Sequence, residues 1–80
     1  MKVTKYFEFR SDFPDRVEIM DDWILRAIDI PIKTETQKDG RIRMWSKIEE
    51  AGDKYLRVVT LEDRKTVHNA FFDRNFKEEK

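Results

Sequence analysis

Basic side chains and the chain's one histidine fall in segments 41–48, 54–61 and 66–73, in a combination that could act on a phosphodiester. His68, Arg57 and Arg43 are the candidate catalytic residues. Cleavage of RNA through its 2′-hydroxyl needs a base, an acid and cations near the phosphate, and the ordinary pKa of histidine suits proton transfer near neutrality. A guanidinium also matches the geometry of a phosphate. The alternative is a solvated sheet face, on which the arginines pair with glutamates of neighbouring strands.

Aromatic and further basic side chains extend this set into a candidate binding surface. Its members are Arg41, Trp45, Lys47, Phe72 and Arg74. A ring among arginines can stack on a base, and Trp and Arg are also enriched at protein-binding hot spots. Such a ring more commonly covers the stems of neighbouring arginines. One histidine, no cysteine and two glycines in separate turns predict no metal site and no cofactor.

The same three segments alternate between apolar and polar residues, which predicts antiparallel β-strands. A period of two gives each strand one face on a core and one free face. The predicted core face holds Ile42, Met44, Leu56, Val58, Val67 and Phe71. The predicted open face holds Arg43, Trp45, Lys47, Arg57, His68 and Phe72.

Weaker patterns predict the remaining elements. Residues 2–10 are expected to form a first strand, and residues 32–37 a short polar strand at a sheet edge. Between them, apolar residues at helical spacing predict one amphipathic helix over residues 14–29. Asp12 is expected to cap this helix, and Pro31 to end it.

These elements define an α+β domain with the order β-α-β-β-β-β, in which a four- to five-stranded antiparallel sheet packs on one amphipathic helix. The 80 residues make a single domain, and the charged residues 75–80 are expected to fray. Asp39-Gly40 predicts a tight type I′ turn between two of the strands, because this turn needs positive φ angles.

The charge is balanced overall but uneven along the chain. Seventeen basic and seventeen acidic residues give a net charge of zero, which argues against a strongly basic nucleic-acid binder. Residues 12–30 nevertheless carry a net charge of −4 and residues 31–48 one of +3, so a local positive face is expected. The absence of cysteine, of a long apolar run and of a signal-peptide pattern predicts a cytoplasmic protein without membrane contact.

The runs 40–45, 55–59 and 67–74, with the order of elements around them, resemble small uncharacterised prokaryotic domains near the RelE/ParE-type toxins, in the barnase–EndoU–RelE-like fold group. Members of that group bury one sheet face under helices and use the other face for RNA. The resemblance implies a ribosome-dependent or free ribonuclease, although ParE-like members act on gyrase instead. Many such toxins have two helices and a strong positive charge, whereas this chain has one predicted helix and zero net charge.

Two functional hypotheses from different classes follow. The first is a non-catalytic module that binds a protein partner with the open sheet face, with homodimerisation through the edge strand 32–37 as one option. The second is a RelE-like toxin-type domain that binds RNA or cleaves it as a metal-independent endoribonuclease. Zero net charge and a single histidine favour the first hypothesis.

Overall fold

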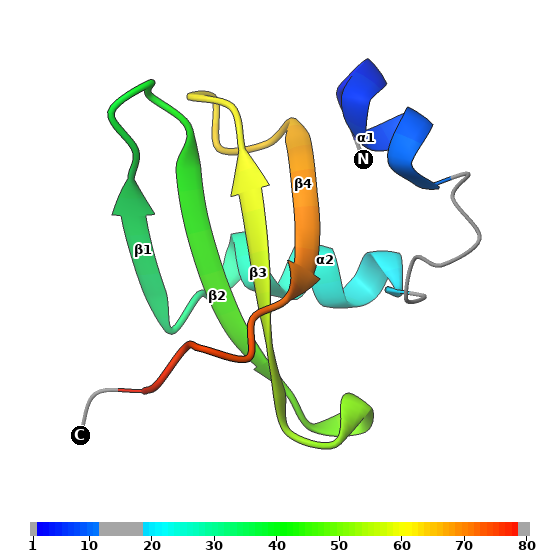
Figure 1. Ribbon diagram of the computed structural model, residues 1–80, viewed down its shortest axis with the longest axis vertical. Coiled ribbons are helices and arrows are strands. Elements are labelled where there is room, and N and C mark those ends of the chain that lie inside the picture. The colour runs from blue at the N-terminus through cyan, green and yellow to red at the C-terminus, as the bar shows by residue number, and fades with distance from the viewer. Residues whose placement is uncertain (1, 12–18, 79–80) are drawn as a thin grey trace.

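Four antiparallel strands form one sheet, in which the spatial order follows the order along the chain (Figure 1). The computed structural model describes residues 2–11 and 19–78. Its elements are α1 (Lys5–Ser11), α2 (Asp21–Asp29), β1 (Lys33–Thr36), β2 (Ile42–Ile48), the short 3-10 helix η1 (Glu49–Ala51), β3 (Lys54–Thr60) and β4 (Val67–Phe72). Neighbouring strands in this order need only short turns to connect them.

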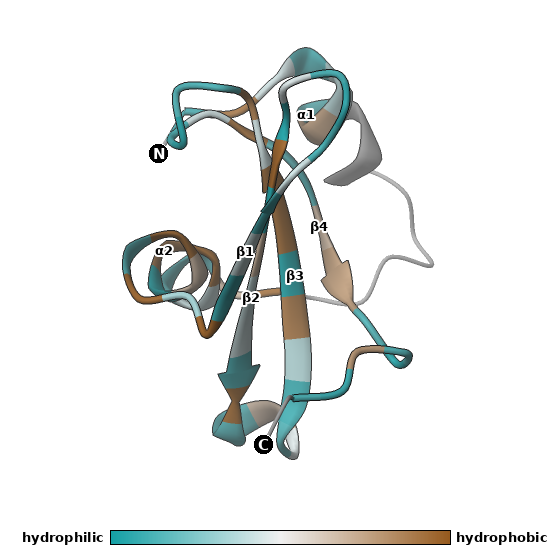
Figure 2. Ribbon diagram, turned by 90° about the vertical axis from the view of Figure 1, so that its left-hand side faces the viewer, coloured by the Kyte–Doolittle hydropathy of each residue, from teal (hydrophilic) through white to brown (hydrophobic). Residues whose placement is uncertain are grey.

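The helix α2 lies against one face of the sheet, and the C-terminal segment crosses the other face (Figures 1 and 2). The predicted α+β architecture with a four-stranded antiparallel sheet is therefore confirmed. The predicted order is wrong, because both helices precede all four strands.

The core lies between α2 and the sheet. Ile24 and Ala27 of α2 are buried against Ile48, Leu56 and Val58, which come from β2 and β3. Full burial of an aliphatic side chain of this size contributes about 1.5–3 kcal/mol. The helix therefore fixes which face of the sheet is covered.

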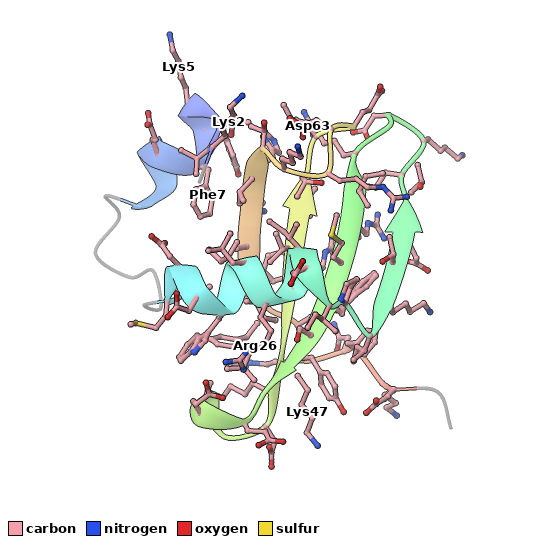
Figure 3. The ribbon with its side chains drawn as sticks, turned by 180° about the vertical axis from the view of Figure 1, so that it is seen from behind. Lys2, Lys5, Phe7, Arg26, Lys47 and Asp63 are labelled. Carbon is pink, nitrogen blue, oxygen red and sulfur yellow. The ribbon has the colours of Figure 1, made fainter. Side chains whose placement is uncertain are left out.

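The segment predicted as a first strand is a helix instead. Thr4 begins α1, because its Oγ1 accepts a hydrogen bond from the backbone N–H of Phe7 at 3.2 Å. Phe7 is buried, and Figure 3 shows it directed from α1 toward the sheet and α2. Only Val3 retains strand character, as an isolated parallel bridge to Val67. The cap and the single anchoring ring outweigh the weak alternation of this segment.

The second helix is shorter than predicted. Residues 12–18, which include the expected cap Asp12, lie outside the described residues. Met20 has extended angles (φ −71°, ψ 142°), so α2 begins at Asp21. Asp21 and Asp22 consequently occupy its first turn, where the helix dipole favours a negative charge. The predicted end at residue 29, ahead of a proline, is confirmed.

The turn at Asp39-Gly40 exists, but its type differs from the prediction. Gly40 has φ +91°, whereas Asp39 is not among the described residues with positive φ. The N–H of Gln37 donates to the carbonyl of Arg41 at 2.8 Å, so the loop has three residues with Gly in the left-handed position. The Asp39 carboxylate accepts a hydrogen bond from the N–H of Arg41 at 3.0 Å, which holds this wider loop.

Strand β4 contains one extra residue relative to β3. Val59 is opposite Asn69, whereas the next residue, Thr60, is opposite Val67, so His68 is the bulged residue. An inserted residue reverses the faces of the side chains beyond it, because side chains alternate along a strand.

The bulge places the two phenylalanines of β4 on the opposite faces from those predicted. Phe72 packs against the core, with its ring 6.1 Å from that of Trp23. Phe71 is 37% exposed on the open face, where the Arg57 guanidinium lies 4.9 Å from its ring centre. No residue type at positions 66–70 signals this bulge, so regular alternation assigned Phe71 and Phe72 wrongly.

The paired substitutions Phe72→Ala and Phe71→Ala test this assignment. We expect Phe72→Ala to lower the free energy of unfolding by about 2–4 kcal/mol, since it removes a ring from the core. We expect Phe71→Ala to lower it by less than about 1 kcal/mol, since only a surface contact with Arg57 is lost. Chemical denaturation of both variants measures the difference, and equal losses would contradict the bulge.

Candidate binding face on the open side of the sheet

The open face is defined here as the side of the sheet that α2 does not cover. Strands β2 and β3 present to it, in opposite pairs, Trp45 with Arg57, Lys47 with Tyr55, and Arg43 with Val59. The structure thus places four of the predicted residues, Arg43, Trp45, Lys47 and Arg57, on the same face, as the alternation of the two strands implies.

The C-terminal segment 73–78 covers the aromatic half of this face (Figure 1). The Trp45 indole Nε1 donates to Oδ2 of Asp73 at 3.1 Å, and the Phe76 ring stacks on Trp45 with centroids 5.1 Å apart. The Tyr55 hydroxyl donates to Oε2 of Glu78 at 3.1 Å, which raises the pKa of Tyr55. Trp45 is only 4% exposed as a result, so its ring is not free to stack on a base.

Arg57 is a half-buried charge on the face. Its side chain is half-buried, its Nε is buried without a hydrogen-bond partner, and no ion pair to it occurs among the described residues. Burial lowers the pKa of Arg57, and the like charge of Arg43 lowers it further. The carboxylates of Asp73 and Glu35 oppose these two effects, but neither forms an ion pair with Arg57. Arginine stays charged in proteins, so a partly desolvated cation lies here without a direct ion pair among the described residues.

Arg43 is the second cation of this half of the face. Its Nη1 lies 3.9 Å from Oε1 of Glu35. The other carboxylate oxygen of Glu35, Oε2, lies 3.7 Å from Nζ of Lys33 on the same strand. The side-chain amide of Gln37 is oriented so that its nitrogen donates to Oδ1 of Asp39 at 3.2 Å and its oxygen accepts a hydrogen bond from Nε of Arg43 at 2.6 Å. Exposed ion pairs of this kind contribute only about 0–1 kcal/mol, so Arg43 keeps most of its capacity for another anion.

His68 belongs to a different environment. Its Nδ1 lies 3.1 Å from Oγ1 of Thr4, and its ring stacks on Tyr6 of α1 with centroids 4.9 Å apart. Burial lowers the pKa of His68, and so does the charge of Arg41, whereas Asp39 opposes them. Among the described residues, no hydrogen bond, ion pair or ring contact joins His68 to Arg43 or Arg57.

The remaining predicted residues lie apart from the arginine pair. Arg41 forms an ion pair with Asp39 at 3.5 Å, near the turn. Lys47 is exposed toward the far end of the sheet (Figure 3), and Arg74 is exposed beyond the end of β4. Phe72 is wrong as an open-face residue, because its ring packs against the core.

Sequence reasoning missed the residues that cover the face. Contacts to Trp45 and Tyr55 come from Asp73, Phe76 and Glu78. The many charged residues of this segment had predicted a frayed terminus instead. The available signal was Phe76 itself, a large apolar ring inside a charged run. An aromatic ring offers substantial area to bury, so it favours packing over solvent.

No family model matches the chain, and neither a curated protein nor a solved structure matches it. The resemblance to RelE/ParE-type domains therefore stays a prediction. In the described residues, no group of three or more His, Asp or Glu side chains could hold a metal ion. No helix of that part of the chain is long and apolar enough to cross a membrane.

The separation of His68 from the arginine pair can be tested by titration of its ring protons in NMR spectra. We expect the pKa of His68 to lie below its usual value of 6.5. The native state then binds fewer protons than the unfolded state just below that pH, so the free energy of unfolding falls as pH decreases there. Arg41→Gln should raise this pKa, and Arg43→Gln should leave it in place. Equal effects would show that His68 shares the environment of Arg43.

Contact between the C-terminal segment and Trp45 makes a second prediction. Phe76→Ala removes the ring stacked on Trp45, so we expect faster hydrogen exchange of the Trp45 indole N–H. Lys77→Ala is the matched control in the same segment and should leave the exchange rate near that of the wild type. An indole equally protected in both variants would contradict the covering role of Phe76.

Proposed function

We propose that the protein is a non-catalytic binding module that takes an acidic segment of a partner protein on its open face. The observation that carries this proposal is Arg57, a half-buried guanidinium without a hydrogen bond or ion pair among the described residues, beside the second cation Arg43. A carboxylate placed between the two would give Arg57 a direct ion pair and add a second one to Arg43, which already lies 3.9 Å from Glu35.

Electrostatics favour an anion at this position. Two guanidinium groups close enough to influence each other repel, and partial burial strengthens the repulsion because it lowers the local dielectric constant. A hydrogen bond to a charged group contributes about 1.5–3 kcal/mol, and an arginine can offer two parallel donors to one carboxylate. The free protein therefore carries an unfavourable interaction that a bound carboxylate removes.

An exposed ring supplies the apolar part of the surface. Phe71 lies beneath the Arg57 guanidinium and is 37% exposed, so a partner side chain can bury its free edge. Arginine and aromatic residues in contact are typical of the few positions that dominate binding energy.

The chain's own C-terminal segment supports a peptide as the partner. Asp73, Phe76 and Glu78 present two carboxylates and one ring to the same face, so this surface already accommodates acidic and aromatic side chains. That segment also covers Trp45, the ring on which a nucleic-acid base would otherwise stack. Zero net charge gives no general attraction for a polyanion.

Cleavage of RNA receives less support from the geometry. A base that abstracts a 2′-hydroxyl proton must lie within hydrogen-bond reach of the atom it acts on, close to the cations that bind the phosphate. His68 instead contacts Thr4 and Tyr6, at the bulge beside α1.

The experiment uses a synthetic peptide of alternating glutamate and phenylalanine, titrated into isotope-labelled protein. The Arg57 Nε–H is buried, so its resonance should be observable and should shift with saturation. We expect Arg57→Gln to weaken binding about tenfold or more, since one charge-assisted hydrogen bond is worth at least about 1.5 kcal/mol. The control Lys65→Gln removes the same charge from the β3–β4 loop and should bind like the wild type.

Two further probes decide between the hypotheses. The same peptide with glutamine in place of glutamate should not bind, because it lacks the carboxylates. A labelled oligouridylate should show neither retention nor cleavage at low salt. Shifts at Arg57 with the oligouridylate, but not with the acidic peptide, would overturn the proposal in favour of RNA binding. If neither the acidic peptide nor the oligouridylate shifts resonances on the open face, both the binding of acidic segments and the binding of RNA are overturned.

A further inference from the structure

The two edges of the sheet differ in what lies against them. Beside β4, Val67 accepts a hydrogen bond from the N–H of Thr4 at 2.9 Å and donates one to the carbonyl of Lys2 at 2.8 Å. Beside β1 (Lys33–Thr36), no strand pairs with the outer side among residues 2–11 and 19–78 (Figure 1). Unpaired N–H and C=O groups on such an edge are a template for another strand.

The hydrogen-bond phase of β1 identifies its outward groups. Gln37 donates to Arg41, its opposite residue, and bonded pairs in an antiparallel ladder recur at every second residue. The backbone N–H and C=O groups of Glu35, which is opposite Arg43, are therefore directed toward β2. Thr34 and Thr36, between these positions, present their N–H and C=O groups to the outside.

The side chains of β1 are complementary to a second copy of the same strand. Lys33 and Glu35 lie on the open-face side, two residues apart, with opposite charges. An antiparallel partner strand centred on Thr34 would place each Lys33 opposite the partner's Glu35. The same register places the outward groups of the two Thr34 residues opposite each other, where they form a bonded pair.

Other registers satisfy fewer of these conditions. Centring on Glu35 pairs the outward groups of Thr34 with those of the partner's Thr36, but it places two glutamates opposite each other. Centring on Thr36 keeps the hydrogen bonds but places Glu35 opposite Gln37, without charge pairing. Like charges directly opposite each other destabilise a strand pair, so the charge pattern selects the register centred on Thr34.

We propose that the protein forms a symmetric homodimer in which the β1 strands of two copies pair about Thr34 and join the two sheets into one. Exposed apolar residues at the start of the strand add to the contact: Ile30 is 70% exposed and Ile32 is 44% exposed. The pairing edge is four residues long, which makes a small interface. The dimer is therefore weak and forms in the micromolar to millimolar range of protein concentration.

The register is tested by charge reversal and mixing, with sedimentation velocity as the readout. We expect wild-type protein to shift from monomer to dimer as concentration rises. Lys33→Glu and Glu35→Lys should each stay monomeric, because each places like charges opposite each other twice. An equimolar mixture of the two variants should restore the dimer as a heterodimer, because every opposed pair then has opposite charges.

Two further variants separate strand pairing from general charge effects. Lys38→Glu changes the charge as much as Lys33→Glu but lies in the turn, so it should dimerise like the wild type. Thr34→Pro removes an outward N–H without loss of a bond to β2, so it should be monomeric. Circular dichroism and the thermal midpoint establish that each variant is folded.

Three outcomes would overturn the dimer: a wild-type protein that stays monomeric at millimolar concentration, a mixture of folded variants that stays monomeric, or a Lys38→Glu variant that loses the dimer. The inference does not depend on the binding of acidic segments. Arg57→Gln should dimerise like the wild type, so failure of one proposal is distinguishable from failure of the other.

Discussion

The contact between α2 and one face of the sheet is the constraint on which the rest of the molecule depends. Ile24 and Ala27 are buried against β2 and β3, and with Phe7 of α1 they complete the core on that side. A chain of 80 residues has little else with which to cover a sheet. The C-terminal segment covers part of the second face, and the rest of that face is the surface proposed to bind a partner.

The division of the open face follows from the chemistry of its residues. Trp45 and Tyr55 are amphipathic rings, and the C-terminal segment satisfies their polar groups with carboxylates while Phe76 covers their apolar surface. Arg57 contacts the ring of Phe71, but its buried Nε has no hydrogen-bond partner. Burial of a charge is unfavourable unless it is paired, so this arrangement destabilises the free protein at the position where the acidic segment is proposed to bind.

Alternation along β2 and β3 was sufficient to assign their faces, because both strands are regular and half-buried. Alternation along β4 assigned Phe71 and Phe72 to the wrong faces, because one bulged residue, His68, inverts the pattern without a sequence signal. Alternation failed again before Ser11, where a threonine cap and one buried ring form a helix in a segment too short for its period to be distinguished. The arginines of the site were therefore predictable from sequence, whereas Phe71 and the covering segment required tertiary contacts.

Glu35 belongs to both of the proposed surfaces. Within one chain it lies 3.9 Å from Arg43 and 3.7 Å from Lys33, and across the proposed dimer it would face the partner's lysine. One carboxylate cannot hold all these cations at short distance at once. Pairing of the β1 edges would therefore draw Glu35 away from Arg43 and leave that guanidinium available to an incoming anion. Dimerisation and binding of an acidic segment would then favour each other, because reciprocal coupling is required by thermodynamic linkage.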